Sequence, residues 1–265
     1  MKVKEINGMR FLKFSTLSRR GGVKHLITTT DSGCAKEGML TEDDRLMSAL
    51  KEHFCHATVY FIRAQHGDKV LVVPPSLNET SQQFECDGLI YVMSLFRGKE
   101  RRNWQPAILA CTTGDCPHLF ITADYLMSDH LPVRLVALVH SGRHGCAKNI
   151  VARAMEQIRE LGCPLTKLRI GLWGGICRHC YVVDVAVWKE LLPYHRHFTP
   201  AGDPRHWHLS LRGVIKQQLA QFGIKPAQIE TSMFCSKCHR QTDGKHFLFS
   251  HRRNELARNG VFISG

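Results

Sequence analysis

Residues 135–142, LVALVHSG, set a short apolar run directly before a histidine, a serine and a glycine. The run is brief and contains β-branched residues, which favours a buried strand over a helix. Residues 146–161 follow with apolar side chains at helical spacing, and Gly162 marks the end of the predicted helix. This part of the chain is therefore predicted to be a strand that leads through a turn into a helix, where α/β proteins often carry site residues.

Further runs of the same kind extend this pattern along the chain. Strands are predicted at residues 57–62, 69–73, 107–111, 119–122 and 168–172, and helices at residues 183–192 and 209–222. The first two strands flank a short polar turn, as in a hairpin or a sharp bend, and residues 193–207, with three prolines, are predicted to form a loop. Ser210 or a neighbour is expected to cap the last helix, which Gly223 ends. Because strands and helices alternate, the sequence favours an α/β or α+β fold with a mixed sheet.

The length and composition are those of a globular protein. The chain has 265 residues, of which 43% are hydrophobic and 22% charged. No apolar stretch approaches the roughly 20 residues of a membrane span, and the N-terminus lacks the apolar core of a signal peptide. The sequence therefore predicts one domain over residues 1–265, in the cytoplasm and without a membrane partner, and it leaves the oligomeric state open.

The charge is strongly positive, since 36 Lys and Arg face 23 Asp and Glu, a formal net charge of +13. Such a charge suits a nucleic acid or an anionic small substrate such as phosphate. The basic clusters, at residues 19–20, 97–102 and 251–253, are short, and the sequence has no long basic tail. The distribution therefore favours a solvated basic surface and a small anionic substrate, with a nucleic-acid-associated protein as the non-enzymatic alternative.

Three residues with reactive side chains occupy comparable places near the ends of predicted strands. His66 lies in the turn after residues 57–62, Cys116 follows residues 107–111, and His140 ends residues 135–139. The separations of 50 and 24 residues are too long for a local zinc motif. From the residues alone, the three are either metal ligands that meet in space, or two hydrogen-bonded histidines and an inert buried cysteine.

The motifs around these residues come in the order of a known family. They are HGxxV at 66–70, DCP at 115–117, VHSG at 139–142, CY at 180–181, LSL at 209–211 and FxFSHRR at 247–253. With this series, from about Arg20 to the C-terminus, the chain resembles the laccase-domain family, also labelled multicopper polyphenol oxidase. Members of that family are understood as purine nucleoside phosphorylases with adenosine deaminase activity.

The resemblance implies a three-layer α/β/α domain with a mixed sheet, and a catalytic metal site. It assigns His66, Cys116 and His140 as the metal ligands and as the catalytic residues. Zinc is the expected metal, with copper as the alternative, because three protein ligands with an open fourth position are typical of catalytic zinc. Such a zinc would activate water for attack on the purine carbon that bears the amino group.

The resemblance further implies purine nucleosides and phosphate as the ligands. The expected reaction is phosphorolysis of adenosine, inosine or guanosine, with adenosine deamination as a second activity, and Arg143, Arg252 and Arg253 are the candidates for substrate binding. The chain differs from the family pattern at Ala64, where the family has Gln, at Arg143 and His144, where it has Trp and Arg, and at Val182, where it has a carboxylate. These replacements predict altered specificity or a catalytically weakened member.

A metal-free enzyme is the main alternative. Cys116 as nucleophile and His140 as base would make a Cys–His hydrolase from the same residues. Stoichiometric zinc favours the phosphorylase, and a metal-free reactive thiol favours the hydrolase. Copper-dependent phenol oxidation needs several histidine-rich copper motifs, which this sequence lacks.

Eleven cysteines without an export signal favour free thiols or metal ligands over disulfides. Cys177 and Cys180 form one CxxC pair, and Cys235 and Cys238 form a second. The 54 residues between the pairs exceed the spacing of about 15 to 20 in a compact zinc ribbon, so a four-thiolate zinc site and ordinary reduced thiols both remain open. The second pair with its following histidine matches the haem-attachment pattern, but haem is not expected without an export route.

Overall fold

The computed structural model describes residues 1–18, 23–32, 44–54, 58–73, 81–95 and 107–265. The basic clusters at residues 19–20 and 97–102 lie outside these ranges. None of the helices in the described ranges combines the length and the apolar composition that a bilayer crossing needs.

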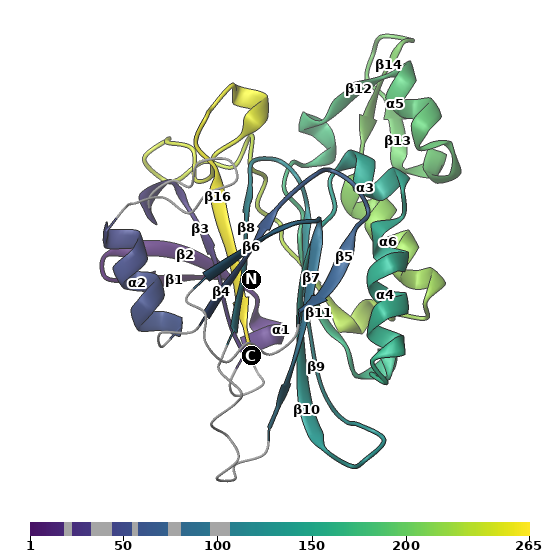
Figure 1. The fold of residues 1–265 in the computed structure, drawn as a ribbon. Helices are drawn as coiled ribbons and strands as arrows, with labels where there is room; N and C mark the ends of the chain where they lie inside the picture. The colour runs from purple at the N-terminus through teal and green to yellow at the C-terminus, as the bar shows by residue number, and fades with distance from the viewer. Residues whose placement is uncertain (19–22, 33–43, 55–57, 74–80, 96–106) are drawn as a thin grey trace.

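Two large mixed sheets lie in the centre of the molecule (Figure 1). The first has the strand order β1 (Lys2–Ile6), β2 (Met9–Lys13), β3 (Lys24–Thr28), β16 (Asn259–Ser264), β8 (Ala107–Thr113), β4 (Thr58–Arg63) and β6 (Ser81–Glu85). The second has the order β15 (Ile229–Thr231), β11 (Arg169–Trp173), β9 (His118–Leu126), β10 (Pro132–His140), β7 (Gly88–Ser94) and β5 (Val70–Val73). A third, antiparallel sheet joins β12 (Val182–Asp184), β14 (His206–Leu209) and β13 (Phe198–Pro200).

Helices lie on the outer faces of the two large sheets, between these sheets and beside the third sheet. They are α1 (Ser15–Ser18), α2 (Asp44–Phe54), α3 (Arg143–Ala147), α4 (Ile150–Glu160), α5 (Val185–Glu190) and α6 (Leu211–Gln221). In Figure 1, α2 lies beside the first sheet, and α4 and α6 lie beside the second. Three buried clusters correspond to these layers: one between α2 and the first sheet, one between the two sheets, and one between the second sheet and α4 with α6.

The expected mixed α/β class is confirmed, but the expectation of three layers around one sheet is wrong. The two large sheets face each other across a core that includes Leu109 of β8 and Leu138 of β10, so the layers are helix, sheet, sheet and helix. A strand that is buried on both faces has a continuous apolar sequence whether a helix or another sheet covers it. The sequence pattern therefore could not distinguish these two arrangements.

The polar turn around His66 is a sharp bend and not a hairpin. β4 belongs to the first sheet and β5 to the second, so the chain crosses from one sheet to the other between them. The connection from β8 to β9 makes the same crossing through Cys116. Because β4 and β8 are parallel neighbours, their carboxyl ends lie at the same edge, and both crossings start there.

The helix predictions hold with changed boundaries. The helix expected at residues 146–161 is two helices, α3 and α4, because Asn149 adopts φ +57° and caps α4. The cap of α6 is Ser210, whose side chain accepts a hydrogen bond from the Gly213 amide at 3.2 Å. The helix expected at residues 183–192 begins two residues later, after β12, with Asp184 as its cap. Residues 193–207 are not a loop throughout, since they contain β13 and the start of β14.

Candidate functional site

Three strand ends bring the candidate ligands together at one edge of the sheets. His66 follows β4, and Cys116 follows β8, at the two crossings from the first sheet to the second. His140 is the last residue of β10 and pairs with His118 at the start of β9. Because β9 begins two residues after Cys116, this pairing sets His140 near the cysteine. The topology of two facing sheets thus brings together three residues that are far apart in the sequence.

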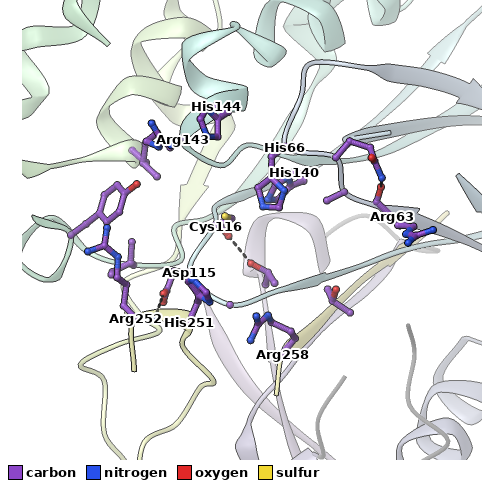
Figure 2. A pocket seen from close by; sticks show the side chains of 18 residues that line it. Arg63, His66, Asp115, Cys116, His140, Arg143, His144, His251, Arg252 and Arg258 are labelled. Carbon is purple, nitrogen blue, oxygen red and sulfur yellow. Dashed lines mark hydrogen bonds between the residues drawn. The ribbon is translucent and has the colours of Figure 1, made fainter. Parts of the chain in front are cut away.

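The side chains of these residues form a compact cluster (Figure 2). One ligand atom each from His66, Cys116 and His140 lies within 4.8 Å of the others. The rings of His66 and His140 have centroids 5.1 Å apart and are nearly perpendicular, at 88°. A zinc ion with tetrahedral angles holds nitrogen and sulfur ligands about 3.3 to 3.8 Å from one another. The cluster therefore fits one zinc ion with small side-chain movements, and its set of two imidazoles and one thiolate is a zinc donor set.

Asp87 supports two of the three ligands. Its carboxylate accepts hydrogen bonds from the His66 amide at 2.9 Å and the Gly67 amide at 2.8 Å. The same carboxylate lies 3.0 Å from Nδ1 of His140, which directs Nε2 of that ring into the cluster. Because Asp87 is fully buried, water does not compete for these hydrogen bonds. His66 itself has φ +56°, and the clamp by Asp87 holds this uncommon backbone conformation.

The electrostatics of the cluster favour a thiolate at Cys116. Burial raises the pKa of this thiol, but the charge and hydrogen bonds of His140 and His66 outweigh burial and lower the pKa to about 6. Burial lowers the pKa of His140, but the Cys116 thiolate and Asp87 outweigh burial and raise it to about 9. Burial raises the pKa of Asp87, but the hydrogen bonds from His140 and from the amides of His66 and Gly67 outweigh burial and lower it. Without metal, these shifts favour a Cys116 thiolate beside a protonated His140. Zinc binds the thiolate form of cysteine and displaces the proton from the His140 ring.

The cluster lies at the wall of a cavity of about 740 Å³, within the size range of small-molecule sites. Four arginines line the cavity, Arg63, Arg143, Arg252 and Arg258, and Asp115 is the one carboxylate among the described lining residues. Asp115 accepts bonds from Ser236 at 2.5 Å, Ser250 at 2.8 Å and the Arg252 amide at 2.7 Å. The lining is therefore cationic and suits an anionic ligand.

The three arginines expected to bind substrate have different surroundings. Arg252 lines the cavity and lies over the ring of Tyr181, with 4.9 Å between its guanidinium carbon and the ring centre. Arg143 also lines the cavity, and Glu190 on α5 holds its guanidinium. Arg253 is not among the lining residues, and its guanidinium donates to the backbone oxygens of Ser236 and Lys237, both at 2.6 Å.

Several residues of the site were not found from the sequence: Arg63, Arg258 and Tyr181 line the cavity, and Asp87 lies behind the ligand cluster. Arg258 is 8% exposed and donates to three backbone oxygens just before β16, and Arg63 ends β4. Asp87 had one signal in the sequence, as a carboxylate directly before the apolar residues of β7. Tyr181 was indicated only by the CY motif. Its hydroxyl is protonated at neutral pH and can donate a hydrogen bond, and burial raises its pKa further, to about 12.

The Asp87→Asn substitution tests the clamp on the ligands. An amide cannot accept two backbone bonds and orient the His140 ring as a carboxylate does, so zinc affinity is expected to fall about 10- to 100-fold. Competition with a chelator of known affinity measures this change. Asp68→Asn is the matched control, since Asp68 is partly exposed and its carboxylate contacts Arg153 at 3.5 Å. Unchanged zinc affinity in Asp87→Asn would show that the clamp has no part in metal binding.

Several known proteins are similar to this chain. A purine nucleoside phosphorylase of Mycobacterium tuberculosis is 29% identical over 209 residues, which cover 78% of this chain and 70% of that protein. An adenosine deaminase from an unknown prokaryotic organism is 21% identical over 200 residues, or 72% of this chain and 68% of the other. The crystal structure of YlmD from Geobacillus stearothermophilus superposes with a TM-score of 0.71 at 20% identity, and covers 98% of this chain and 97% of that one.

The family model described as multi-copper polyphenol oxidoreductase laccase matches residues 16–264, which include all of the site. Nearly the whole of this chain is therefore covered by one family. The protein belongs to the multi-copper polyphenol oxidoreductase laccase family, the laccase-domain family that its motifs resemble.

Proposed function

We propose that this protein is a zinc-dependent purine nucleoside phosphorylase with adenosine deaminase activity. The observation that carries the proposal is the His66–Cys116–His140 cluster at the wall of a cationic cavity of about 740 Å³. Relatives named purine nucleoside phosphorylase and adenosine deaminase support it. A zinc ion held by the three side chains would supply a Lewis acid and lower the pKa of water at its open position.

Phosphorolysis requires the cavity to hold phosphate beside the ribose. A phosphate oxygen forms a bond to the anomeric carbon, the bond from that carbon to the purine nitrogen breaks, and the base takes the electron pair and a proton. Arg252 and Arg258, which lie on the same segment before β16, are suited to hold the phosphate by charge. The hydroxyl of Tyr181, protonated at neutral pH, is suited to donate a hydrogen bond to the substrate.

Deamination of adenosine uses the same cavity with water in place of phosphate. Water adds to the purine carbon that bears the amino group, and ammonia leaves with a proton from the water. Two activities in one cavity are expected to share the metal ligands and to differ in their need for the arginines. The replaced residues Ala64, Arg143, His144 and Val182 border or lie near this cavity and are proposed to alter its specificity.

Product analysis tests the proposal. Protein of known metal content is incubated with adenosine, inosine, guanosine or methylthioadenosine, with and without phosphate. Phosphate-dependent release of the free base from at least one nucleoside is the expected result, with inosine formed from adenosine. Zinc-loaded protein that yields neither free base nor inosine would contradict the proposal and leave the family membership intact.

A Cys–His hydrolase is the second candidate, and a specific observation favours it. Cys116, His140 and Asp87 stand in the order of a nucleophile, a base and the carboxylate that orients the base, with the lowered pKa of about 6 at the thiol. Metal content separates the two candidates. Full activity after complete removal of zinc, with loss on alkylation of Cys116, would favour the hydrolase.

Arg252→Ala tests the proposed phosphate site. Loss of this charge is expected to raise the KM for phosphate about 10-fold and to change adenosine deamination less, since deamination uses no phosphate. Steady-state kinetics of both reactions on the same preparation measures the difference. Arg205→Ala is the control, because Arg205 is 83% exposed and lies outside the cavity lining. Equal losses in both reactions would contradict a phosphate-specific role.

A further inference from the structure

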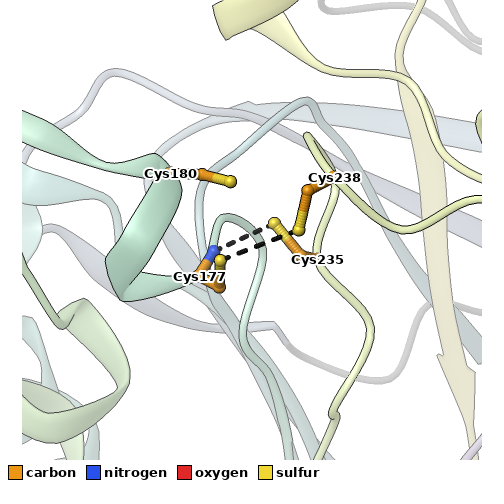
Figure 3. A group of neighbouring side chains, drawn as sticks. All are labelled: Cys177, Cys180, Cys235 and Cys238. Atoms are coloured by element: carbon orange, nitrogen blue, oxygen red, sulfur yellow. Dashed lines mark hydrogen bonds between the residues drawn. The ribbon is translucent and has the colours of Figure 1, made fainter.

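A second cluster of ligands lies outside the proposed catalytic site. The sulfur atoms of Cys177, Cys180, Cys235 and Cys238 all lie within 4.8 Å of one another (Figure 3). The first pair follows β11, at the 3-10 turn Arg178–Cys180, and the second pair follows β15. The two CxxC pairs, with 54 residues between them in the sequence, therefore meet in space and face each other.

The distances suit a single tetrahedral ion. Zinc bound to four thiolates holds the sulfur atoms about 3.8 Å apart, because each Zn–S bond is about 2.3 Å. The sulfur atoms of Cys177 and Cys238 are 3.9 Å apart. A cluster of several iron atoms would need the sulfurs further apart, and a disulfide would need them much closer. Four thiolates around one ion are typical of structural zinc.

The surroundings also suit a negatively charged metal centre. When zinc replaces four S–H bonds by four Zn–S bonds, four protons leave and the centre keeps a net charge of −2. The amide of Cys177 donates to the sulfur of Cys235 at 3.2 Å. The charge of Arg212 on α6 interacts with Cys177 and Cys235. Nε and Nη2 of Arg212 are buried without a hydrogen-bond partner among the described residues. The half-buried guanidinium donates through Nη1 to the backbone oxygen of Ser232 at 2.8 Å, and an anionic centre would offset its charge.

The cluster joins two parts of the chain that form the cavity. Residues 232–258, between β15 and β16, are all described, and they contain no strand or α-helix, only the isolated bridge between Arg240 and His246 and the 3-10 turn His251–Arg253. The segment nevertheless carries Arg252 and Arg258 into the cavity lining. A metal ion bound by all four cysteines would link Cys235 and Cys238 to the turn after β11. This link would hold the segment in place where strands and α-helices do not.

We propose that Cys177, Cys180, Cys235 and Cys238 bind one zinc ion in a closed structural site that fastens residues 232–258 to the turn after β11. This site is independent of the proposed catalytic zinc, since the two clusters share no residue. The protein therefore binds two zinc ions per chain, one with an open position and one without. The proposal does not require the proposed enzymatic activity.

Zinc counting on whole protein purified under reducing conditions tests this proposal. Wild-type protein is expected to hold two zinc ions per chain, Cys238→Ser one, and Cys116→Ala one. Cys238 is exposed, so serine is tolerated sterically and the variant is expected to fold. Cys238→His is the matched variant, because imidazole is a zinc ligand and the exposed position has room for it, and it is expected to keep two.

A spectroscopic measurement identifies the ligands. Cadmium bound in place of zinc is expected to give a strong thiolate-to-metal absorption, most of which disappears in Cys238→Ser and little of which disappears in Cys116→Ala. Cys163→Ala controls for loss of any thiol, since Cys163 is buried and belongs to neither cluster. Thermal unfolding of Cys238→Ser is expected at a lower temperature than that of Cys238→His.

Three results would overturn the proposal. The first is an unchanged zinc count in Cys238→Ser. The second is a disulfide among the four cysteines in protein purified under reducing conditions. The third is bound iron in place of zinc. If the wild-type protein holds one zinc ion and Cys238→Ser holds none, the four-cysteine site stands and the proposed catalytic zinc falls.

Discussion

Cys116→Ala is expected to lose the metal of the His66–Cys116–His140 cluster and at least about 10²- to 10³-fold of turnover. Cys116 is the one anionic ligand of this cluster, and its pKa of about 6 makes it a thiolate at neutral pH. Two neutral imidazoles hold zinc more weakly and cannot offset the charge of the ion. Metal analysis and rates of base release on the same sample measure both effects.

Cys111→Ala is the control for this experiment. Cys111 lies on β8, five residues before Cys116, and is buried outside both ligand clusters. Its replacement is expected to cost stability but to leave both zinc ions and the activity in place. Full zinc occupancy in Cys116→Ala would rule out the assignment of Cys116 as a ligand.

Gly175→Ala is expected to lower the free energy of unfolding strongly, although it adds only one methyl group near the site. Gly175 has φ +55°, and a Cβ atom there would lie 2.1 Å from the backbone oxygen of Asp115. That oxygen also accepts a hydrogen bond from the Ile176 amide at 2.9 Å, so it cannot move aside without breaking the contact between the two turns. The backbone strain and the overlap together are expected to cost about 2 to 5 kcal/mol.

The same change is expected to displace Cys116, which follows Asp115 directly. Zinc in the His66–Cys116–His140 cluster is therefore expected to fall together with the free energy of unfolding. Gly162→Ala separates the two causes, because Gly162 has φ +75° but open space where the new methyl group would lie. It is expected to cost only about 1 kcal/mol and to leave the metal in place. Equal losses in the two variants would show that contact with Asp115 does not matter.

The strands around the site were predictable from sequence because each contains a buried, continuous apolar run. Residues 107–111, 119–122 and 135–139 all lie within observed strands, and Ser210 caps α6 as expected. The first strand β1 escaped prediction because it is mostly exposed and three of its five residues are charged. The number of layers could not be predicted, because the sequence of an apolar strand does not show whether a helix or a sheet covers it.

The ligand cluster was suggested by strand ends and by family motifs, and the geometry brings its three members together. What local patterns could not supply was the pairing of distant segments. Asp87 supports His140 from 53 positions away, and Arg258 enters the cavity from the strand end next to β8. Such contacts depend on the crossing of the chain between two sheets. They follow from topology, which no local period or spacing encodes.

Transfer of isotopically labelled phosphate to the sugar distinguishes phosphorolysis from hydrolysis of a nucleoside. Zinc-loaded protein is incubated with inosine and labelled phosphate, and the sugar product is identified by mass spectrometry. Ribose 1-phosphate that carries the label is expected, formed in step with free hypoxanthine and lost in Cys116→Ala. Unlabelled ribose in place of the phosphate ester, or no cleavage of any purine nucleoside by zinc-loaded protein, would contradict the proposed phosphorolysis.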